Sequence, residues 1–264
     1  MDNKIILIGK KSFLGHYIKK NLNKKLDILH INLQEFQKLD NEELEKYNYI
    51  CNCSITKKYQ NNRYKSENDI DIKITNKIKK LKIKYIFLSS RKVYEAKKNL
   101  SEFAKLKPLN NYARNKIITE NKIRALLKKR SLILRISNVI GKPIKNPKRV
   151  TKNFIDNYIK FKNKNKIIKY KNYYKDFLSI DQFTKIFFHI VKKNLYGVYN
   201  VSLGQKVYIS ELLNWMNENN YKTFIPINNF IDDDSFYLNN KKLIKKINYK
   251  IKKSDLKKFC LNFD

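Results

Sequence analysis

Three side chains in the first half of the chain have the types and spacing needed to move a proton at a carbonyl or alcohol. Tyr112 and Lys116 are four residues apart, so on a helix they share one face and the ammonium lies beside the phenol. A nearby positive charge lowers the pKa of a phenol, which otherwise stays protonated at neutral pH. Ser90 would supply a hydroxyl that orients a substrate oxygen within reach of the tyrosine. The chain has 18 Tyr and 59 Lys plus Arg, so the Tyr–Lys pair alone carries little weight.

Strand and helix patterns surround these three residues. The apolar residues 85–88 run into Ser89 and Ser90, which predicts a buried strand that delivers hydroxyls to a sheet edge. The segment after Pro108 predicts a helix that carries Tyr112 and Lys116.

A glycine-containing turn near the start of the chain joins a predicted strand, residues 4–8, to a predicted helix. The turn holds Gly9, Ser12 and Gly15, with Ser12 at the position of the middle glycine of the usual triplet. Such a βα turn binds dinucleotides, because glycine lets the backbone approach a pyrophosphate and the helix N-terminus stabilises its charge. The chain has only five glycines, so two of them six residues apart here favour this interpretation.

Together these motifs resemble the extended short-chain dehydrogenase/reductases of the nucleotide-sugar epimerase, dehydratase and reductase group. Further matches follow in the family's order over nearly the full length, at residues 134–141, 174–181, 197–201 and 209–212. The resemblance implies an α/β fold, a Rossmann-like doubly wound parallel sheet with a small C-terminal substrate-binding lobe. We expect residues 1–140 to form the NAD(P)-binding domain, with 179–201 returning to it, and residues 141–178 and 202–264 to form the substrate lobe.

The resemblance also implies roles for individual residues. Tyr112 would be the acid/base, Lys116 would lower its pKa and hold the nicotinamide ribose, and Ser90 would orient the substrate oxygen. Asn138 would contact the substrate, and Lys175 would contact its nucleotide diphosphate. The expected cofactor-binding residues are Gly9, Lys11, Ser12, Phe13, Leu14, Gly15, Asn32, Cys53, Ser54, Ile55, Tyr112 and Lys116.

The choice between NAD(H) and NADP(H) depends on the end of the second strand, where an acidic residue selects NAD by accepting from the ribose 2′-hydroxyl. Here Ile31 and Asn32 occupy that region, and Lys10 and Lys11 lie in the phosphate loop. We therefore expect NADP(H) to be slightly preferred.

The residues after Ser90 bear on the reaction. In the family, a 4,6-dehydratase has an Asp-Glu pair there, whereas this chain has Arg91 and Lys92. Permanent cations cannot protonate a leaving hydroxyl, so dehydration is disfavoured. In the family, a 3,5-epimerase/reductase has a cysteine at the position of Arg91, so that reaction is disfavoured as well. The remaining readings are a reductase of a 4-keto-6-deoxy nucleotide sugar, a nucleotide-sugar 4-epimerase, and a non-catalytic NAD(P)-binding regulatory protein. The short chain and the absent acidic residue favour the reductase.

Other segments predict the rest of the fold. Residues 28–32, 49–53, 131–136 and 198–201 predict strands. Residues 41–47 predict a helix with Asn41 as its cap, and residues 68–83, 180–191 and 209–216 predict further helices.

Composition excludes several classes. No apolar run approaches the ~20 residues of a membrane span, so we expect a soluble cytoplasmic protein without membrane contact. Three cysteines predict reduced thiols, with Cys51 and Cys53 on one side of a strand and no metal site. The net charge of +36 is dispersed over every segment, which we interpret as coding bias and not as a specific nucleic-acid site. The resemblance implies a homodimer.

Overall fold

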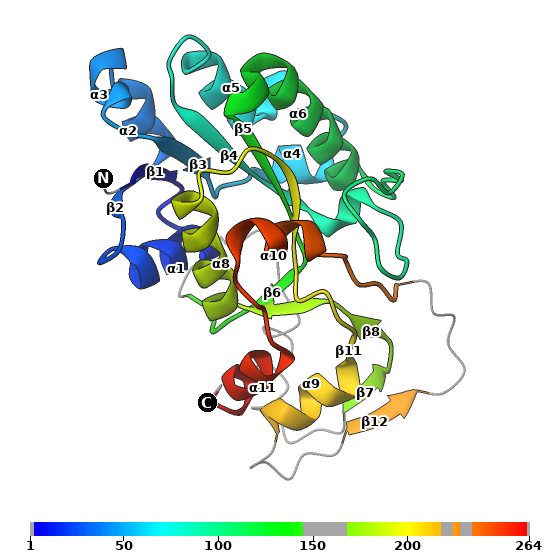
Figure 1. Cartoon of the computed structure of the whole chain (residues 1–264). Coiled ribbons are helices and arrows are strands. Elements are labelled where there is room, and N and C mark those ends of the chain that lie inside the picture. The colour runs from blue at the N-terminus through cyan, green and yellow to red at the C-terminus, as the bar shows by residue number, and fades with distance from the viewer. Residues whose placement is uncertain (1–2, 145–167, 218–223, 228–233, 263–264) are drawn as a thin grey trace.

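The computed structural model describes residues 3–144, 168–217, 224–227 and 234–262. Within these residues, the centre of the molecule is a six-stranded sheet with the order β2-β1-β3-β4-β5-β10, in which every neighbouring pair is parallel (Figure 1). Its strands are β1 (Lys4–Ile8), β2 (Asp27–Ile31), β3 (Tyr49–Asn52), β4 (Lys84–Ser90), β5 (Ser131–Ile136) and β10 (Gly197–Val201). The expected α/β fold with a doubly wound parallel sheet is confirmed.

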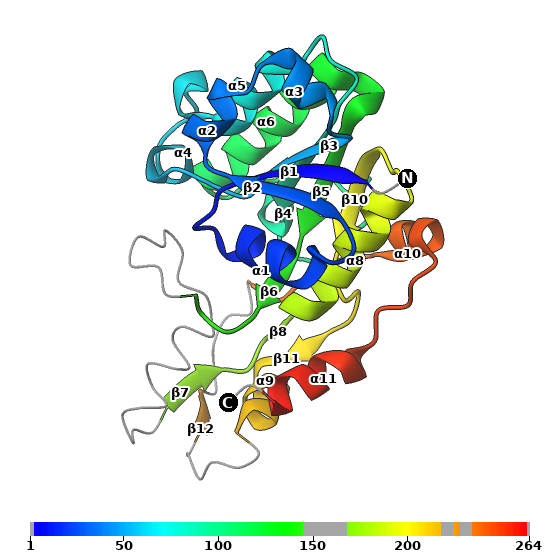
Figure 2. The same ribbon diagram turned by 90° about the vertical axis from the view of Figure 1, so that its left-hand side faces the viewer.

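Helices cover both faces of the sheet, which lies between them when seen edge-on (Figure 2). One face carries α1 (Phe13–Leu22) and α8 (Ile180–Lys192), and the other carries α2 (Leu33–Lys38), α3 (Asn41–Glu45), α5 (Ile70–Lys77) and α6 (Asn111–Leu127). The short helix α4 (Lys57–Asn61) packs against α6. Three 3₁₀ turns complete this part, at Ser66–Asn68, Arg91–Val93 and Lys128–Arg130.

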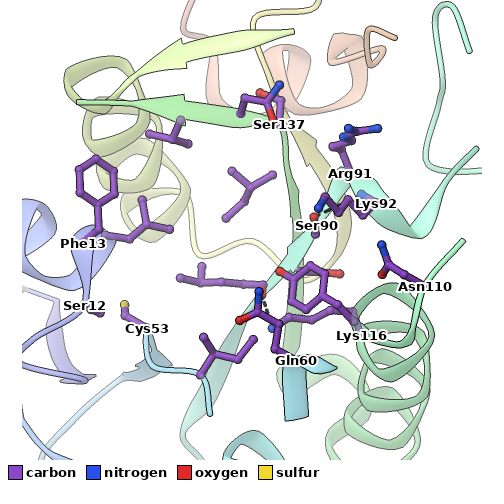
Figure 3. Close-up of a pocket in the computed structure, with 18 of the residues that line it drawn as sticks. Ser12, Phe13, Cys53, Gln60, Ser90, Arg91, Lys92, Asn110, Lys116 and Ser137 are labelled. Carbon is purple, nitrogen blue, oxygen red and sulfur yellow. Dashed lines mark hydrogen bonds between the residues drawn. The ribbon is translucent and has the colours of Figure 1, made fainter. Parts of the chain in front are cut away.

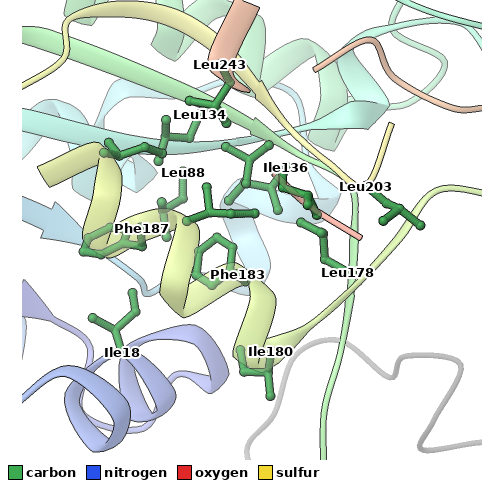
Figure 4. Packing of buried hydrophobic residues seen from close by; sticks show 14 of the residues in the cluster. Ile18, Leu88, Leu134, Ile136, Leu178, Ile180, Phe183, Phe187, Leu203 and Leu243 are labelled. Atoms are coloured by element: carbon green, nitrogen blue, oxygen red, sulfur yellow. The ribbon is translucent and has the colours of Figure 1, made fainter. Parts of the chain in front are cut away.

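The strand sequences explain this layering, because successive residues of a strand point to opposite faces. In β1, Ile5 and Leu7 belong to the core beneath α1 and α8, whereas Ile6 and Ile8 belong to the core beneath α5 and α6. Sheets buried on both faces need such continuous apolar strands. Phe183 and Phe187 of α8 lie over the sheet between Ile18 and Leu134 (Figure 4).

Two helices begin or end at different places from those expected. The residue that caps α3 is Asp40 and not Asn41, since the Asp40 carboxylate accepts from the backbone N–H of Glu43 and the Glu43 side chain accepts from that of Asp40. The helix expected over 68–83 is shorter. Its N-cap is Asp69, and α5 ends at Lys77 although the apolar spacing continues to Leu81.

The C-terminal part of the chain forms a smaller layer beside the sheet. Its paired strands are β6 (Asn138–Ile140) with β9 (Phe177–Ser179), β7 (Ile168–Lys171) with β12 (Phe224–Ile227), and β8 (Tyr174–Lys175) with β11 (Val207–Tyr208). Its helices are α9 (Ile209–Met216), α10 (Lys241–Ile247) and α11 (Lys253–Leu261). The buried Asp176 carboxylate accepts from the backbone N–H groups of Leu203, Gly204 and Leu238 and so joins three segments of this layer.

Residues 145–167 of the expected substrate lobe lie outside the described residues. No helix in the described parts of the chain combines the length and the hydrophobicity that a membrane span needs.

Candidate active site

The parallel strands bring distant residues to one edge of the sheet. Ile8 pairs with Asn52 and Ser90 pairs with Ile136, so the carboxyl ends of β1, β3, β4 and β5 lie together. The chain leaves β1 toward β2 and returns on the other side of β1 as β3. Ligands of open α/β sheets bind at the carboxyl edge, next to such a switch point.

Ser90 is the last residue of β4 and lies at the mouth of this edge, with Arg91 and Lys92 directly after it (Figure 3). Its hydroxyl accepts from the backbone N–H of Lys92 at 3.2 Å. That bond leaves the hydroxyl proton available for a ligand oxygen and sets the orientation of the side chain.

Helix α6 positions Tyr112 and Lys116 across the cavity from the glycine turn. The Asn110 side chain caps the helix by accepting from the N–H of Ala113 at 2.9 Å, which places Tyr112 in the first turn. The Lys116 ammonium is buried and donates to the Leu88 carbonyl of β4 at 2.9 Å. It also lies 5.9 Å from the centroid of the Tyr112 ring.

A buried ion pair fixes α6 against the strand that carries Ser90. Glu120, one turn beyond Lys116, pairs with Arg135 of β5 at 2.7 Å, and it accepts from the Ser89 hydroxyl at 2.5 Å. Arg135 and Glu120 are 4% and 1% exposed. Separating the two members of such a pair leaves an uncompensated buried charge, so the pair keeps α6 in a fixed position against β5.

The glycine turn fits a dinucleotide pyrophosphate. Gly9 has φ of +114°, a conformation that side chains rarely adopt, and a Cβ on Gly15 would lie 2.5 Å from the Ser12 hydroxyl. Ser12 caps α1 by accepting from the Gly15 N–H at 3.1 Å. The backbone can therefore approach a ligand closely, and the N-terminus of α1 faces the position of an anion. These residues fit a nicotinamide dinucleotide.

A cavity of about 1290 Å³ brings most of the expected residues together. Those that line it are Gly9, Lys11, Ser12, Phe13, Leu14, Cys53, Ser54, Ile55, Ser90, Tyr112, Lys116, Asn138 and Lys175. Figure 3 shows Ser12, Phe13 and Cys53 on one side of this space and Ser90 and Lys116 on the other. Two expected residues lie outside the lining, namely Gly15, which is buried in the first turn of α1, and Asn32.

The sequence interpretation of the β2 end was wrong in one respect, because a carboxylate does lie there. Asn32 caps α2, and Glu35 folds back to accept from the Asn32 N–H at 2.8 Å. Its other oxygen accepts from the Lys10 ammonium at 2.7 Å. The two bonds lower the pKa of Glu35. The capping-box spacing of Asn32 and Glu35 is readable in the sequence and could have located this carboxylate.

A buried acid beneath the cavity was not expected from the sequence. Asp71 of α5 accepts from the Tyr85 hydroxyl at 2.6 Å and from the Asn52 amide at 3.0 Å. Burial raises its pKa to about 6, the Lys116 charge opposes that effect, and Asp69 adds to it. Asn52, at the end of β3, connects this acid to the cavity wall because its side chain also bonds Ser54.

The sequence over most of the sheet matches a known family. The family model described as "NAD dependent epimerase/dehydratase family" covers residues 5–202. The chain belongs to this family. Among curated proteins, no sequence matches the chain.

Solved structures of similar fold cover nearly the whole chain. One is UDP-N-acetylglucosamine 4-epimerase from Methanobrevibacter ruminantium, 19% identical, covering 99% of this chain and 97% of that chain with a TM-score of 0.79. A second is ADP-L-glycero-D-manno-heptose-6-epimerase from Helicobacter pylori, 18% identical, covering 99% and 95% with a TM-score of 0.80. A third is dTDP-4-dehydrorhamnose reductase from Bacillus anthracis, in complex with NADP, 16% identical, covering 100% and 99% with a TM-score of 0.78. At these identities the likeness establishes the fold.

Proposed function

We propose that the protein is an NAD(P)-dependent oxidoreductase that reduces a 4-keto-6-deoxy nucleotide sugar. The observation that carries this proposal is the single cavity that joins the glycine turn to Ser90, Tyr112 and Lys116. One part of this cavity fits a dinucleotide, and the other supplies the groups that handle a substrate oxygen. Epimerases and a reductase of nucleotide sugars share the fold, which supports a substrate of that class.

A bound nicotinamide dinucleotide would supply hydride chemistry at a sugar carbon. Ser12, Phe13 and Leu14 would hold its pyrophosphate at the start of α1, and Lys116 would hold the nicotinamide ribose. Tyr112 gives its phenolic proton to the substrate oxygen, while Ser90 donates to the same oxygen and orients it. The Lys116 ammonium lies 5.9 Å from the Tyr112 ring centroid, on the same helix face.

The groups beside Ser90 argue against a dehydratase. Arg91 and Lys92 line the cavity directly after Ser90, where elimination of a hydroxyl would need a carboxylic acid. Arg91 is only 13% exposed and stays cationic. Reduction of a carbonyl needs no second acid, which is consistent with these cations.

The cofactor proposal has two parts. We propose that NADP(H) is slightly preferred, from Lys11 in the turn and from Lys10 to the extent that Glu35 releases it. Glu35 favours the second candidate function, a nucleotide-sugar 4-epimerase that recycles NAD, because a carboxylate at this end of the sheet disfavours the 2′-phosphate of NADP.

The remaining alternative is a non-catalytic dinucleotide-binding protein, which would bind nicotinamide dinucleotide without turnover.

The proposal is tested by mass spectrometry of products after incubation with NADPH and a panel of 4-keto-6-deoxy nucleotide sugars. A product two mass units heavier than its substrate, with loss of NADPH absorbance, is expected. Conversion of a 4-hydroxy nucleotide sugar into an isomer of equal mass, without net cofactor consumption, would instead identify an epimerase. Bound cofactor with no product from either set would identify the non-catalytic alternative.

A further inference from the structure

Two cations and a carboxylate meet on the cavity wall beyond Ser90. Asp234 accepts from the Arg91 guanidinium at 3.1 Å through one oxygen and from the Lys175 ammonium at 2.5 Å through the other. All three residues line the cavity. The carboxylate therefore occupies a position between two cations that converge on it from different segments of the chain.

The two cations are held by the protein, whereas the carboxylate lies toward solvent. The Arg91 and Lys175 side chains are 13% and 15% exposed, and the Asp234 side chain is 42% exposed. The Arg91 guanidinium lies 3.9 Å from the centroid of the Phe236 ring, and the Lys175 ammonium lies 4.5 Å from that of Tyr173. Rotation of Asp234 into water would therefore leave both cations in place.

Two polar atoms of residues that line the cavity have unused hydrogen-bonding capacity. Among the described residues, the buried Nε of Arg91 and the buried amide nitrogen of Asn138 have no hydrogen-bond partner. Both residues line the cavity. Buried donors are nearly always satisfied in folded proteins, so two such donors in one cavity indicate a ligand that accepts hydrogen bonds.

The charges of the cavity point to the same chemistry. Among its described lining residues, the basic side chains are Lys11, Arg91, Lys92, Lys116 and Lys175, and the acidic side chain is Asp234. Burial opposes ionisation of Asp234, but the bond from Lys175 and the charges of Lys175 and Arg91 lower its pKa. Asp234 is thus an anion that lies between the two cations. A phosphate or carboxylate of a ligand could occupy the same position, because Arg binds both groups in the same way.

We propose that Arg91 and Lys175 form a subsite for an anionic oxygen group of the substrate, and that this group exchanges places with the Asp234 carboxylate. This rests on the proposed function, which supplies a nucleotide-sugar substrate. The group is either the diphosphate or a carboxylate on the sugar, because both present the oxygens that the subsite binds. Asp234 then competes with the anionic group of the substrate for the two cations.

The direction in which one substitution changes the affinity for pyrophosphate tests the exchange. Inorganic pyrophosphate is titrated into wild type and Asp234→Asn by calorimetry, with folding checked by thermal unfolding. Removing the competing charge should tighten pyrophosphate binding about tenfold, the equivalent of 1.4 kcal/mol. If Asp234 merely orients the two cations, the same variant binds pyrophosphate no better than wild type or more weakly, and the exchange is refuted.

Two further variants locate the effect. Arg91→Gln removes the guanidinium and should weaken pyrophosphate binding by roughly fivefold or more. Lys245→Ala removes an exposed lysine of α10 and should change the affinity by less than twofold, since that ammonium lies outside the cavity lining. Equal losses in both variants would show that pyrophosphate responds only to the net charge, which would overturn the subsite.

Two ligands that differ by one carboxylate show whether the subsite binds the diphosphate or a carboxylate on the sugar. UDP-glucose and UDP-glucuronate are titrated into wild type and Arg91→Gln. A diphosphate source predicts the same loss for both ligands, and a sugar carboxylate predicts a loss for UDP-glucuronate alone. Loss for neither ligand contradicts the proposal. Failure of the proposed function is separate, since an inactive protein that passes the pyrophosphate test would still have the subsite.

Discussion

The Lys10 ammonium lies 2.7 Å from the Glu35 carboxylate, so a cation of the glycine turn is neutralised by the helix that follows β2. The Asn32 and Glu35 capping box holds the carboxylate in this position. Lys10 is therefore not a free charge for the 2′-phosphate of NADP, and the cofactor preference depends on how strongly Glu35 retains it.

The first prediction concerns Glu35→Gln, which keeps the side-chain length and removes the charge. Lys10 is then available to a 2′-phosphate, and the repulsion from the carboxylate is gone. The ratio of the NADH dissociation constant to the NADPH dissociation constant should rise roughly tenfold. Fluorescence titration with both cofactors measures it.

Glu43→Gln is the matched control, because Glu43 occupies the same position in the capping box of α3 and has no lysine partner among the described residues. It removes the charge of a capping-box residue but keeps the oxygen that accepts the capping bond, as Gln182 does at the start of α8, so it should not change cofactor preference. An equal change in both variants would mean that the loss of one negative charge anywhere on this side of the protein, and not the charge beside Lys10, alters cofactor binding.

The local motifs were predictable because their physics is local. The strand–glycine–helix sequence around Gly9 and the four-residue spacing of Tyr112 and Lys116 need only neighbouring residues to define them. Asp40 and Asn41 are both good capping residues, so the sequence could not decide which one begins α3. The residues directly after β2 carry no carboxylate, and Glu35 reaches this position only because a helical turn returns its side chain to Asn32.

The second prediction concerns the acid/base role of Tyr112. Tyr112→Phe keeps the ring against α6 and removes the phenolic proton, so turnover should fall ~10²–10⁴-fold while cofactor affinity stays nearly unchanged. Steady-state kinetics and cofactor titration measure both quantities. Tyr196→Phe, a 57% exposed tyrosine outside the cavity lining, should keep full activity. More than half the wild-type rate in Tyr112→Phe would show that another group transfers the proton.

The third prediction concerns the buried Asp71, whose pKa is raised to about 6. A carboxyl whose pKa is raised in the folded state stays protonated to a higher pH in the folded chain than in the unfolded chain. Its stabilisation is complete below about pH 4 and is lost as pH rises through about 6. In Asp71→Asn this loss, on the order of 3 kcal/mol, should disappear from the pH dependence of the unfolding free energy.

Urea unfolding at several pH values between 4 and 7 measures this dependence. Asp176 also has a pKa raised by burial, to about 7, so wild type and Asp71→Asn should both retain its contribution. Asp27→Asn removes an exposed carboxyl and should leave the curve parallel to that of wild type. Parallel curves for Asp71→Asn as well would mean that Asp71 ionises normally.

The Asp234 contacts show what the sequence could not predict. Asp234 is 143 residues from Arg91, and the two meet only because Phe236 and Leu238 pack into a cluster with Val93 and Tyr94. The motif around Lys175 predicted its role from neighbouring residues, but its ion-pair partner Asp234 lies on this distant segment. A contact between segments so far apart depends on the tertiary fold and leaves no periodic pattern in the sequence.

The last prediction concerns the proposed role of Lys175 at the substrate diphosphate. A charge-assisted bond to phosphate contributes roughly 1.5–3 kcal/mol, so Lys175→Ala should raise the substrate KM about tenfold or more and leave NADPH affinity unchanged. The Lys175 side chain is 15% exposed, so salt screens it weakly and the effect should persist at high ionic strength. Lys128→Ala removes an exposed lysine beyond α6 and should change KM little at any salt concentration. If the two variants raise KM equally, and both effects vanish with added salt, Lys175 contributes only to the general positive field of the protein and does not contact the diphosphate.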